Sequence, residues 1–337
     1  MLKNDFNTIL SRFRNIRVAV LGDVMLDVYA WGKVTRISPE APVPVVNVKK
    51  TTCCLGGAAN VMRNIATLGA SAEGFGITGK DLSGRQVREE LLAAGISADG
   101  ILDDPDRVTT EKRRIMASGQ QLLRIDEENT TPVSDVLRRK LVDSIIDRIR
   151  KGSIDAVIFE DYAKGLLASW MLEEIVKEAS AHNVATALDP KPGGLEPVKG
   201  ITFIKPNRLE AFAMAKLEDK TPGADPVSDR QLHEAAGRLL ELWEPDHLLI
   251  SLASQGMALF RPGMATEVIP TRAREVFDVS GAGDTVTASY TLALAGGADP
   301  VMAAEIANRA ASVVVAKVGT APISFEELVK VCEQEDI

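Results

Sequence analysis

Short apolar runs alternate with amphipathic stretches along most of the chain, and this alternation predicts an α/β fold. Residues 17–21 (RVAVL) and 156–159 (AVIF) have the length and composition of strands that are buried on both faces. Residues 136–150 carry apolar positions at the spacing of a helix with one buried face. We expect further strands at residues 184–188, 201–204 and 248–252, and further helices at residues 5–13, 56–68, 83–94, 168–181 and 232–242. The pattern predicts one doubly wound, mostly parallel sheet with helices on both faces.

Polar residues stand where several of these apolar runs end. Asp23 and Asp27 follow the first run, and three other runs are followed by residues 160–165 (EDYAKG), 189–191 (DPK) and 205–210 (KPNRLE). Ligands of open α/β sheets bind at the carboxyl ends of the strands. We therefore expect the active site along this edge of the sheet, although Asp23 also fits an ordinary turn.

Two segments interrupt the alternation of strands and helices. Residues 29–50 contain several prolines and the alternating text PVPVVNV, and that density of proline excludes a central strand. Residues 105–126 indicate two strands joined by a Ser-Gly turn. In the first of these strands Lys112 and Arg114 lie on the same face, because side chains alternate along a strand. We expect the two segments to form a small sheet, a lid over the site of a single domain that takes in residues 1–337.

The chemistry of the site centres on residues 276–287 (VFDVSGAGDTVT), a strand-to-helix turn between a strand-like apolar segment and a helix-forming one. Gly281 and Gly283 allow a tight turn and a close approach of a ligand to the backbone. The first N–H groups of the following helix lack partners within the helix, so the turn offers an anion hole for phosphate. Asp284 in such a hole fits a general base beside a phosphate that is being transferred. Physical reasoning alone leaves equally open that Asp284 is simply a favoured residue near a helix start.

Residues 74–81 (GFGITGKD) match the spacing of two nucleotide-binding motifs, the dinucleotide fingerprint G-x-G-x-x-G and the phosphate loop G-x-x-x-x-G-K. The text before them is a weak strand, and Asp81 stands where the phosphate loop needs Ser or Thr to hold Mg²⁺. We therefore interpret these glycines as parts of a strand and a turn before a helix. A dinucleotide-dependent oxidoreductase that uses this stretch is the rival hypothesis from another class of enzyme.

Composition narrows the function further. The 337 residues are 45% hydrophobic and 26% charged, as in ordinary globular proteins. A net charge of -8 without a basic run argues against nucleic acid and anionic membranes as partners, and no apolar stretch approaches the roughly 20 residues of a membrane span. Cys53, Cys54 and Cys332 are too few and too poorly spaced for a zinc site. These features fit an enzyme of the reduced cytoplasm.

The text DVSGAGDT at residues 278–285 resembles the signature D-x-[ST]-G-A-G-D-[TS] of the ribokinase-like (PfkB) sugar kinases. More narrowly, the chain resembles the members of this family that phosphorylate D-glycero-D-manno-heptose 7-phosphate at its anomeric carbon. That likeness rests on GDVMLD (22–27), RISPEAPVPVV (36–46), GGAAN (56–60), QQLLRID (120–126), DYAKG (161–165) and DPK (189–191). The resemblance covers nearly the whole chain and implies a ribokinase-like fold with a β-sheet lid. A rival within the family is a kinase acting on ribose, a ketodeoxy sugar acid or a nucleoside.

The resemblance implies a role for each residue that matches a family motif. Asp284 would be the catalytic base, and the anion hole would be formed by Gly281, Ala282 and Gly283. Sugar hydroxyls would be bound by Asp27, Gly56, Gly57 and Asn60. The nucleotide side would be formed by Lys205, Asn207, Glu210, Ser251, Gly256 and Asp278. Within that set Asn207 and Glu210 match the N-x-x-E motif, which influences Mg²⁺ binding, whereas residues 251–253 read Ser-Leu-Ala where the family usually has T-x-G.

The same resemblance implies cofactors, substrates and partners. We expect ATP and Mg²⁺ as cofactors, with the use of a monovalent cation undecided, and a sugar phosphate as the acceptor. A 7-phosphate needs cations at the far end of the sugar, and we expect Lys112 and Arg114, with Arg124 on the partner strand, to supply them. Exposed lid edges would promote aggregation, so we expect the lids of two chains to pair in a homodimer. Many relatives carry a further nucleotidyltransferase domain, and we expect a separate protein to perform the adenylyl step.

Overall fold

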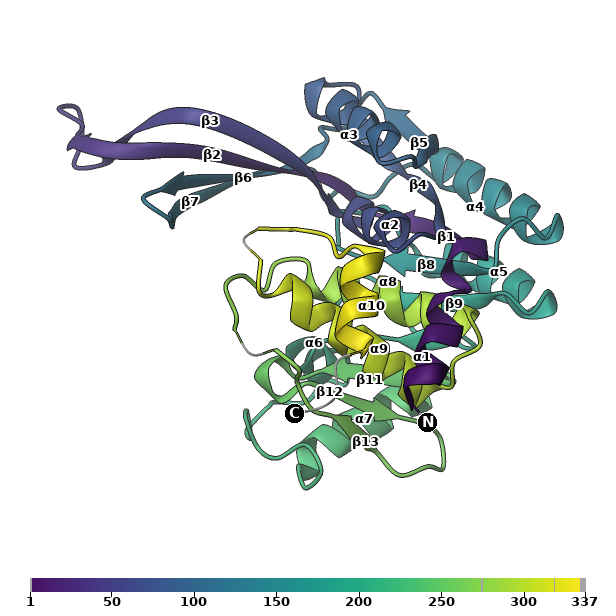
Figure 1. Cartoon of the computed structure of the whole chain (residues 1–337). Helices are drawn as coiled ribbons and strands as arrows, with labels where there is room; N and C mark the ends of the chain where they lie inside the picture. Colours follow the sequence, from purple (N-terminus) through teal and green to yellow (C-terminus); the bar gives the residue numbers. More distant parts are fainter. Residues whose placement is uncertain (1, 274, 318, 334–337) are drawn as a thin grey trace.

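The computed structural model describes residues 2–273, 275–317 and 319–333, and the centre of this part of the chain is a nine-stranded sheet (Figure 1). The strand order is β13-β12-β11-β10-β9-β8-β1-β4-β5. The bounds are β1 (Arg17–Gly22), β4 (Ser71–Gly79), β5 (Ser97–Asp104), β8 (Ala156–Glu160), β9 (Ala185–Asp189), β10 (Phe203–Ile204), β11 (His247–Ser251), β12 (Met257–Phe260) and β13 (Glu267–Ile269). Neighbours from β5 across to β11 pair in parallel, and β12 and β13 add two antiparallel strands at one edge. The predicted α/β fold with a mostly parallel sheet is confirmed.

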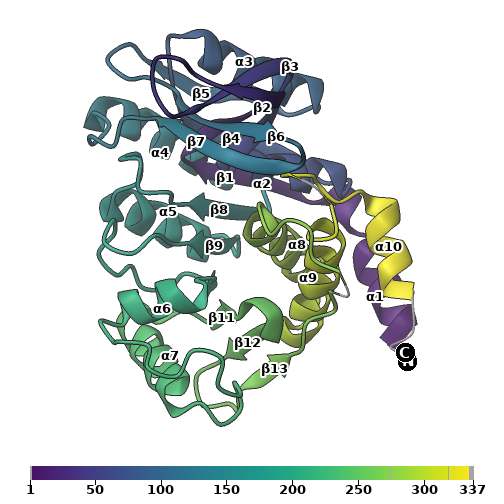
Figure 2. The same ribbon diagram turned by 90° about the vertical axis from the view of Figure 1, so that its left-hand side faces the viewer.

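Helices cover both faces of this sheet (Figure 2). One face carries α1 (Leu2–Leu10), α2 (Ala58–Thr67), α3 (Leu82–Ala93), α8 (Ala282–Ala295), α9 (Pro300–Val314) and α10 (Phe325–Glu333), and the other carries α4 (Asp135–Arg150), α5 (Ser169–Ala181), α6 (Arg208–Met214) and α7 (Arg230–Trp243). Val18 and Val20 of β1 belong to one apolar core, and Ala19 and Leu21 belong to the other. Both faces of β1 are therefore buried, as its unbroken apolar run predicted. Among the helices of the described ranges, none is both long and apolar enough to cross a membrane.

A second sheet of four strands projects from the body as an arm, with the order β3-β2-β6-β7 (Figure 1). It consists of β2 (Val24–Ile37), β3 (Pro44–Gly57), β6 (Thr110–Ala117) and β7 (Gln120–Glu127), and we call it the lid. β2 and β3 reach further toward the body than the range 29–50 expected from the sequence, because β2 starts two residues after β1 ends and β3 runs directly into α2. β6 and β7 meet at the expected turn, where Ser118 and Gly119 both have positive φ.

The two ends of the lid differ in burial. Near the body, Leu26 and Leu55 belong to the apolar core. Far from the body, Val34, Ile37 and Val43 are exposed. The distal half of the lid therefore presents apolar side chains to solvent, and apolar surface that gathers in one region favours association with another chain.

The glycines of residues 74–81 lie inside or at the end of β4, not in a phosphate-binding loop. A Cβ at Gly74 would lie 2.8 Å from Met62 Sδ, and one at Gly76 would lie 2.9 Å from the carbonyl oxygen of Gly22. Close packing of the strand against its neighbours therefore explains both glycines. The strand, turn and helix predicted for this stretch are confirmed, and the rival hypothesis of a dinucleotide fingerprint is wrong.

Candidate active site

The N-terminus of α8 forms the glycine-containing turn that the sequence predicted. Gly281 precedes the helix with a φ of 78°, and a Cβ there would lie 2.8 Å from Asn60 Nδ2. Glycine suits this position because it tolerates both the left-handed backbone and the close approach. The Ala282 N–H donates to the carbonyl oxygen of Val279 (3.2 Å), so within the described residues the open N–H groups of the first turn start at Gly283. An anion would therefore meet fewer amides of the Gly-Ala-Gly text than the sequence implied.

The segment before this turn differs from the prediction. Residues 275–281 form no strand, and Phe277 and Asp278 donate their N–H groups to the carbonyl oxygen of Val315 (2.8 and 3.2 Å). The side chain of Phe277 is 66% exposed. The predicted strand-to-helix turn is therefore a loop-to-helix turn, because an apolar run does not reveal whether a strand partner is present.

Asp284 lies in the first turn of α8, and two donors hold its carboxylate. Asn60 Nδ2 donates to Oδ2 (2.6 Å), and the Tyr162 hydroxyl donates to Oδ1 (2.7 Å). Burial raises the pKa of Asp284 above its ordinary value, while these two hydrogen bonds stabilise the charged form. The result is an oriented carboxylate of raised proton affinity at the N-terminus of α8, an arrangement that a general base requires.

The orientation of Asn60 is fixed in turn by its neighbour on α2. Arg63 Nη2 donates to Asn60 Oδ1 (2.8 Å), so the amide nitrogen of Asn60 must face Asp284. Arg63 also donates to the carbonyl oxygen of Thr320. Sequence reasoning missed both Arg63 and Tyr162. The DYAKG motif contained Tyr162, but the local sequence does not show that the Tyr162 hydroxyl reaches Asp284 on α8.

Three of the predicted sugar-binding residues lie at the root of the lid, where β2 and β3 pair. Asp27 is buried there, and Arg114 Nη1 donates to its Oδ1 (2.5 Å). A Cβ at Gly56 would lie 2.8 Å from Asp27 Oδ2, and Gly57 has a φ of 55° immediately before α2. These glycines let the backbone pass close to Asp27 and then turn into the helix that carries Asn60. The structure therefore brings the predicted sugar-binding residues of this region together.

The three lid cations of the prediction are ion-paired. Lys112 Nζ lies 3.2 Å from Asp126 Oδ2 and 3.5 Å from Glu128 Oε2, and Arg124 Nε lies 2.8 Å from Asp126 Oδ1. Arg114 is paired with the buried carboxylate at the lid root. Lys112 and Asp126 are directly opposite each other in the β6–β7 ladder. The sequence placed the cations on the lid, but it did not show the acids that face them.

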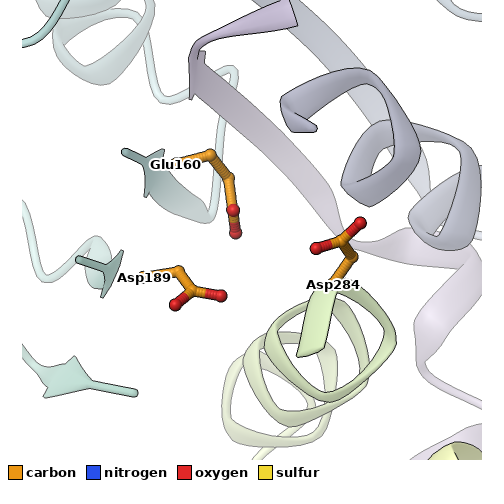
Figure 3. A group of neighbouring side chains, drawn as sticks. All are labelled: Glu160, Asp189 and Asp284. Carbon is orange, nitrogen blue, oxygen red and sulfur yellow. The ribbon is translucent and has the colours of Figure 1, made fainter. Parts of the chain in front are cut away.

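Three carboxylates converge next to the turn (Figure 3). Glu160 ends β8, Asp189 ends β9 and Asp284 is on α8, and one oxygen of each lies within 4.8 Å of the others. Burial, followed by the Asp189 and Asp284 carboxylates, raises the pKa of Glu160 well above its ordinary value. Lys205 Nζ lies 2.8 Å from Asp189 Oδ2, and a Cβ at Gly283 would lie 3.4 Å from the same Nζ, so the ammonium group borders the turn. Sequence reasoning gave Glu160 no role, although its place at the end of a central strand was a usable signal.

Asn207 and Glu210 form the N-terminal cap of α6. The Glu210 N–H donates to Asn207 Oδ1, and the Asn207 N–H donates to Glu210 Oε2, both at 2.9 Å, which makes a capping box. Lys191 Nζ lies 2.7 Å from Glu210 Oε1. Asn207 forms an isolated bridge with Ser251, so these predicted nucleotide-side residues are neighbours. Their side chains already have structural partners.

The contacts of Asp278 and Gly256 also have structural explanations. Asp278 Oδ1 accepts from the Ser280 N–H (2.9 Å) and Oδ2 accepts from the Gly319 N–H (3.0 Å). Burial opposes the charge of Asp278, but these hydrogen bonds outweigh it and lower its pKa. Gly256 has a φ of 88°, and a Cβ there would collide with the carbonyl oxygen of Ile269. Both residues hold loops in place at the carboxyl edge of the sheet.

Known proteins resemble this chain in sequence over most of its length. The family described as pfkB family carbohydrate kinase matches residues 15–327. A bifunctional protein HldE from Desulfatibacillum aliphaticivorans is 43% identical over 319 residues, which cover 95% of this chain and 63% of that protein. A bifunctional protein HldE from Geobacter sulfurreducens is 38% identical over 329 residues, which cover 98% of this chain and 65% of that protein. The chain thus spans less than two thirds of the length of these relatives.

Solved structures share the fold. A ribokinase from Arabidopsis thaliana in complex with ribose and ATP has a TM-score of 0.70 at 19% identity, covering 95% of this chain and 99% of its own. Phosphofructokinase-2 from Escherichia coli in complex with potassium has a TM-score of 0.74 at 18% identity, covering 94% and 98%. Similarity at this level shows a ribokinase-like fold. The family match and the curated relatives go further: this chain belongs to the pfkB family of carbohydrate kinases, as its signature predicted, and is a sugar kinase.

Proposed function

We propose that this kinase transfers the γ-phosphate of ATP to the anomeric C1 hydroxyl of D-glycero-β-D-manno-heptose 7-phosphate and forms the 1,7-bisphosphate, a precursor of ADP-heptose and lipopolysaccharide. The observation that carries the phosphoryl-transfer step is the Asp284 carboxylate, oriented by Asn60 and Tyr162 at the N-terminus of α8. The choice of sugar rests on the lid segments 36–46 and 120–126, whose text resembles that of heptose 7-phosphate kinases.

The proposed reaction is an in-line displacement assisted by a base. Asp284 takes the proton of the acceptor hydroxyl while the oxygen attacks the γ-phosphorus and ADP leaves. Because Asn60 and Tyr162 each hold one carboxylate oxygen, the remaining lone pairs keep fixed directions. The Gly283 amide and the neighbouring Lys205 ammonium group lie where negative charge develops on the transferred phosphoryl group. The lid covers the sugar and excludes water, which would otherwise accept the phosphate.

ATP and Mg²⁺ are the proposed cofactors. Mg²⁺ bound to the nucleotide phosphates neutralises charge on the phosphoryl oxygens. Asn207 and Glu210 are proposed to influence that ion indirectly, because their side chains already cap α6 and Glu210 is paired with Lys191. This proposal keeps the N-x-x-E motif on the nucleotide side of the site.

The inner face of the lid is the proposed site for the 7-phosphate. Lys112 lies opposite Asp27 in the β2–β6 ladder, and Arg114 is two residues further on the same face. Their ion pairs hold the cations in place before the substrate arrives, and Arg124 lies opposite Arg114 on β7. A phosphate that carries nearly two negative charges can replace Asp126 as the partner of these groups.

The assembly and the location of the enzyme are also proposals. The exposed apolar side chains of the distal lid, such as Ile37 and Val43, support a homodimer in which two lids pair. Cys53, Cys54 and Cys332 are free thiols, which supports a reduced, cytoplasmic setting.

A substrate panel tests the proposed function. Initial rates of ATP consumption would be measured with β-heptose 7-phosphate, ribose, fructose 6-phosphate and adenosine at several concentrations of each. We expect the largest kcat/KM with the heptose phosphate, and a new phosphorus signal from a phosphate on the anomeric carbon. A larger kcat/KM with any other acceptor, or phosphorylation at another carbon, would overturn the proposal.

A further inference from the structure

Asp23 is the acidic residue for which the sequence allowed two interpretations, an ordinary turn and a residue that meets a ligand. It stands between β1 and β2, where the chain leaves the body for the lid, and it is buried. In an ordinary turn an Asp side chain accepts from a backbone N–H about two residues further on. Asp23 Oδ2 instead accepts from the N–H groups of Tyr162 (2.9 Å) and Lys164 (3.1 Å), which lie 139 and 141 residues further on. The side chain therefore holds a distant segment, and an ordinary turn does not explain it.

The segment that Asp23 holds has a strained backbone. Ala163 lies between the two N–H donors and has a φ of 55°, a left-handed conformation that residues with a Cβ rarely adopt. Such a conformation persists only where the surrounding contacts impose it. The Ala163 N–H also donates to a carboxylate, Asp161 Oδ1 at 2.8 Å. Three successive N–H groups are thus bound by carboxylates, and these contacts account for the backbone conformation at Ala163.

The backbone that Asp23 holds carries the side chain of Tyr162. The Tyr162 hydroxyl donates to Asp284 Oδ1 at 2.7 Å, so Tyr162 is bound to Asp23 through its backbone and to Asp284 through its side chain. Asn60 is the second donor to Asp284. The carbonyl oxygen of Asp23 accepts from the N–H of Ala58 (3.1 Å), the first residue of the helix that carries Asn60. Both segments that orient the Asp284 carboxylate are therefore attached to Asp23.

The charge of Asp23 suits it to hold backbone N–H groups. Burial raises the pKa of Asp23 to about 6, while the hydrogen bonds from the N–H groups of Lys164 and Tyr162 favour its charged form. At neutral pH the side chain is therefore a carboxylate, which accepts hydrogen bonds and donates none. An N–H group binds a charged acceptor more strongly than a neutral one. Asp at this position thus holds the segment more firmly than Asn would.

We propose that Asp23 is a positioning residue for phosphoryl transfer, which acts through Tyr162 on the carboxylate of Asp284. The Asp23 side chain fixes the backbone of residues 162–164, this backbone places the Tyr162 hydroxyl, and the hydroxyl orients one oxygen of the base. A displacement of a catalytic group by about 1 Å can cost on the order of 10²-fold in rate. The inference rests on the proposed role of Asp284 as general base, and it does not depend on which sugar is the acceptor.

The test compares kcat, KM and Tm of Asp23→Ala and Asp299→Ala, with the acceptor that gives the wild type its largest kcat/KM. Asp299 is the matched control, because its Oδ1 also accepts from two backbone N–H groups, at 2.9 and 3.1 Å, at the start of α9. Both variants should have a lower Tm than the wild type. Only Asp23→Ala should lose kcat, by about 10–10²-fold, with KM for both substrates changed much less. A normal kcat in Asp23→Ala, or an equal loss in the control, would overturn the proposal.

A double-mutant cycle with Tyr162→Phe separates positioning from a general weakening of the fold. If Asp23 acts through the Tyr162 hydroxyl, Asp23→Ala should lower kcat much less in the Tyr162→Phe background than in the wild type. Losses that multiply would overturn the proposal.

Asp23→Asn is the second variant, and it carries the cycle if Asp23→Ala does not fold. It keeps the shape of the side chain and a neutral acceptor oxygen, so its kcat should lie between those of the wild type and Asp23→Ala. Its loss of kcat should likewise shrink in the Tyr162→Phe background, and an undiminished loss there would contradict the proposal. The proposed function fails separately, if the wild type prefers an acceptor other than heptose 7-phosphate; the cycle is then measured with that acceptor and has the same expected outcome.

Discussion

Replacing Asp284 by Asn removes the basicity of the proposed catalytic residue and keeps its size. Asn60 cannot turn its amide over, because Arg63 holds the amide oxygen. The new amide would therefore present its oxygen to Asn60 and its NH₂ group to Tyr162, whose hydroxyl can accept as well as donate. Both contacts survive, so α2, α8 and the turn should keep their arrangement.

The expected loss is confined to the chemical step. A positioned general base contributes about 10²–10⁴-fold to the rate. At about 1.4 kcal/mol for each factor of ten, this range is about 3–6 kcal/mol of transition-state stabilisation. The substrate still meets the same lid and the same glycine turn, so KM should change much less than kcat.

The assay measures kcat and KM for both substrates, with binding of the sugar phosphate followed separately by calorimetry. Asp299→Asn is the matched control, because Asp299 caps the N-terminus of α9 through the Val301 and Met302 N–H groups and Asn caps equally well. The control should turn over normally. An Asp284→Asn enzyme with a kcat within a few-fold of the wild type would refute the role of Asp284 as general base. Asp284 would then be only a residue that is favoured near a helix start.

Three further variants test the surroundings of the base, the lid and the metal. Tyr162→Phe leaves the Asp284 carboxylate buried but removes a hydrogen bond that stabilises its charge, so the pKa of Asp284 should rise. Activity is lost as the pH falls through that pKa, so the variant should lose activity at a higher pH than the wild type. An unchanged pH–rate profile would argue against a role for the Tyr162–Asp284 hydrogen bond. Lys112→Met combined with Arg114→Met should raise KM for heptose 7-phosphate on the order of 10²-fold or more and change KM for ATP little, whereas Arg113→Met on the opposite face of the lid should change neither; normal sugar-phosphate binding by the double variant would place the phosphate site elsewhere. Glu210→Gln keeps the capping box but loses a charge, so more Mg²⁺ should be needed for half-maximal activity, and an unchanged requirement would reduce the motif to a helix cap.

The sequence predicted the strands, the helices and the edge of the sheet that carries the site, because each of these depends on the local amino-acid sequence. The runs that became β1, β8, β9 and β11 are mostly apolar in their central positions, and a strand buried on both faces needs that composition. Once the strands are parallel, their polar ends must lie at one edge. The position of Asp284 beside an N-terminal turn followed in the same way, from two glycines and a helix-forming segment.

Contacts between distant elements were not predictable from the same text. The pairing of Lys112 with Asp126 depends on the register of two strands, and a slip of one residue would separate them. The hydrogen bond from Tyr162 to Asp284 depends on how β8 and α8 pack, which local text does not specify. The apolar text before the glycine turn predicted a strand, yet Phe277 is bonded to the end of α9 and is largely exposed. Tertiary partners decided each of these outcomes.

β3 of the lid continues directly into α2, the helix whose Asn60 orients the Asp284 carboxylate. Gly57 ends β3 and begins the turn into α2, and Asn60 follows three residues later with its amide on Asp284. A displacement of β3 in the lid would therefore be transmitted to Asn60 through one continuous segment of chain. If the sugar binds on the lid as proposed, its binding and the orientation of the Asp284 carboxylate are coupled through this continuous segment.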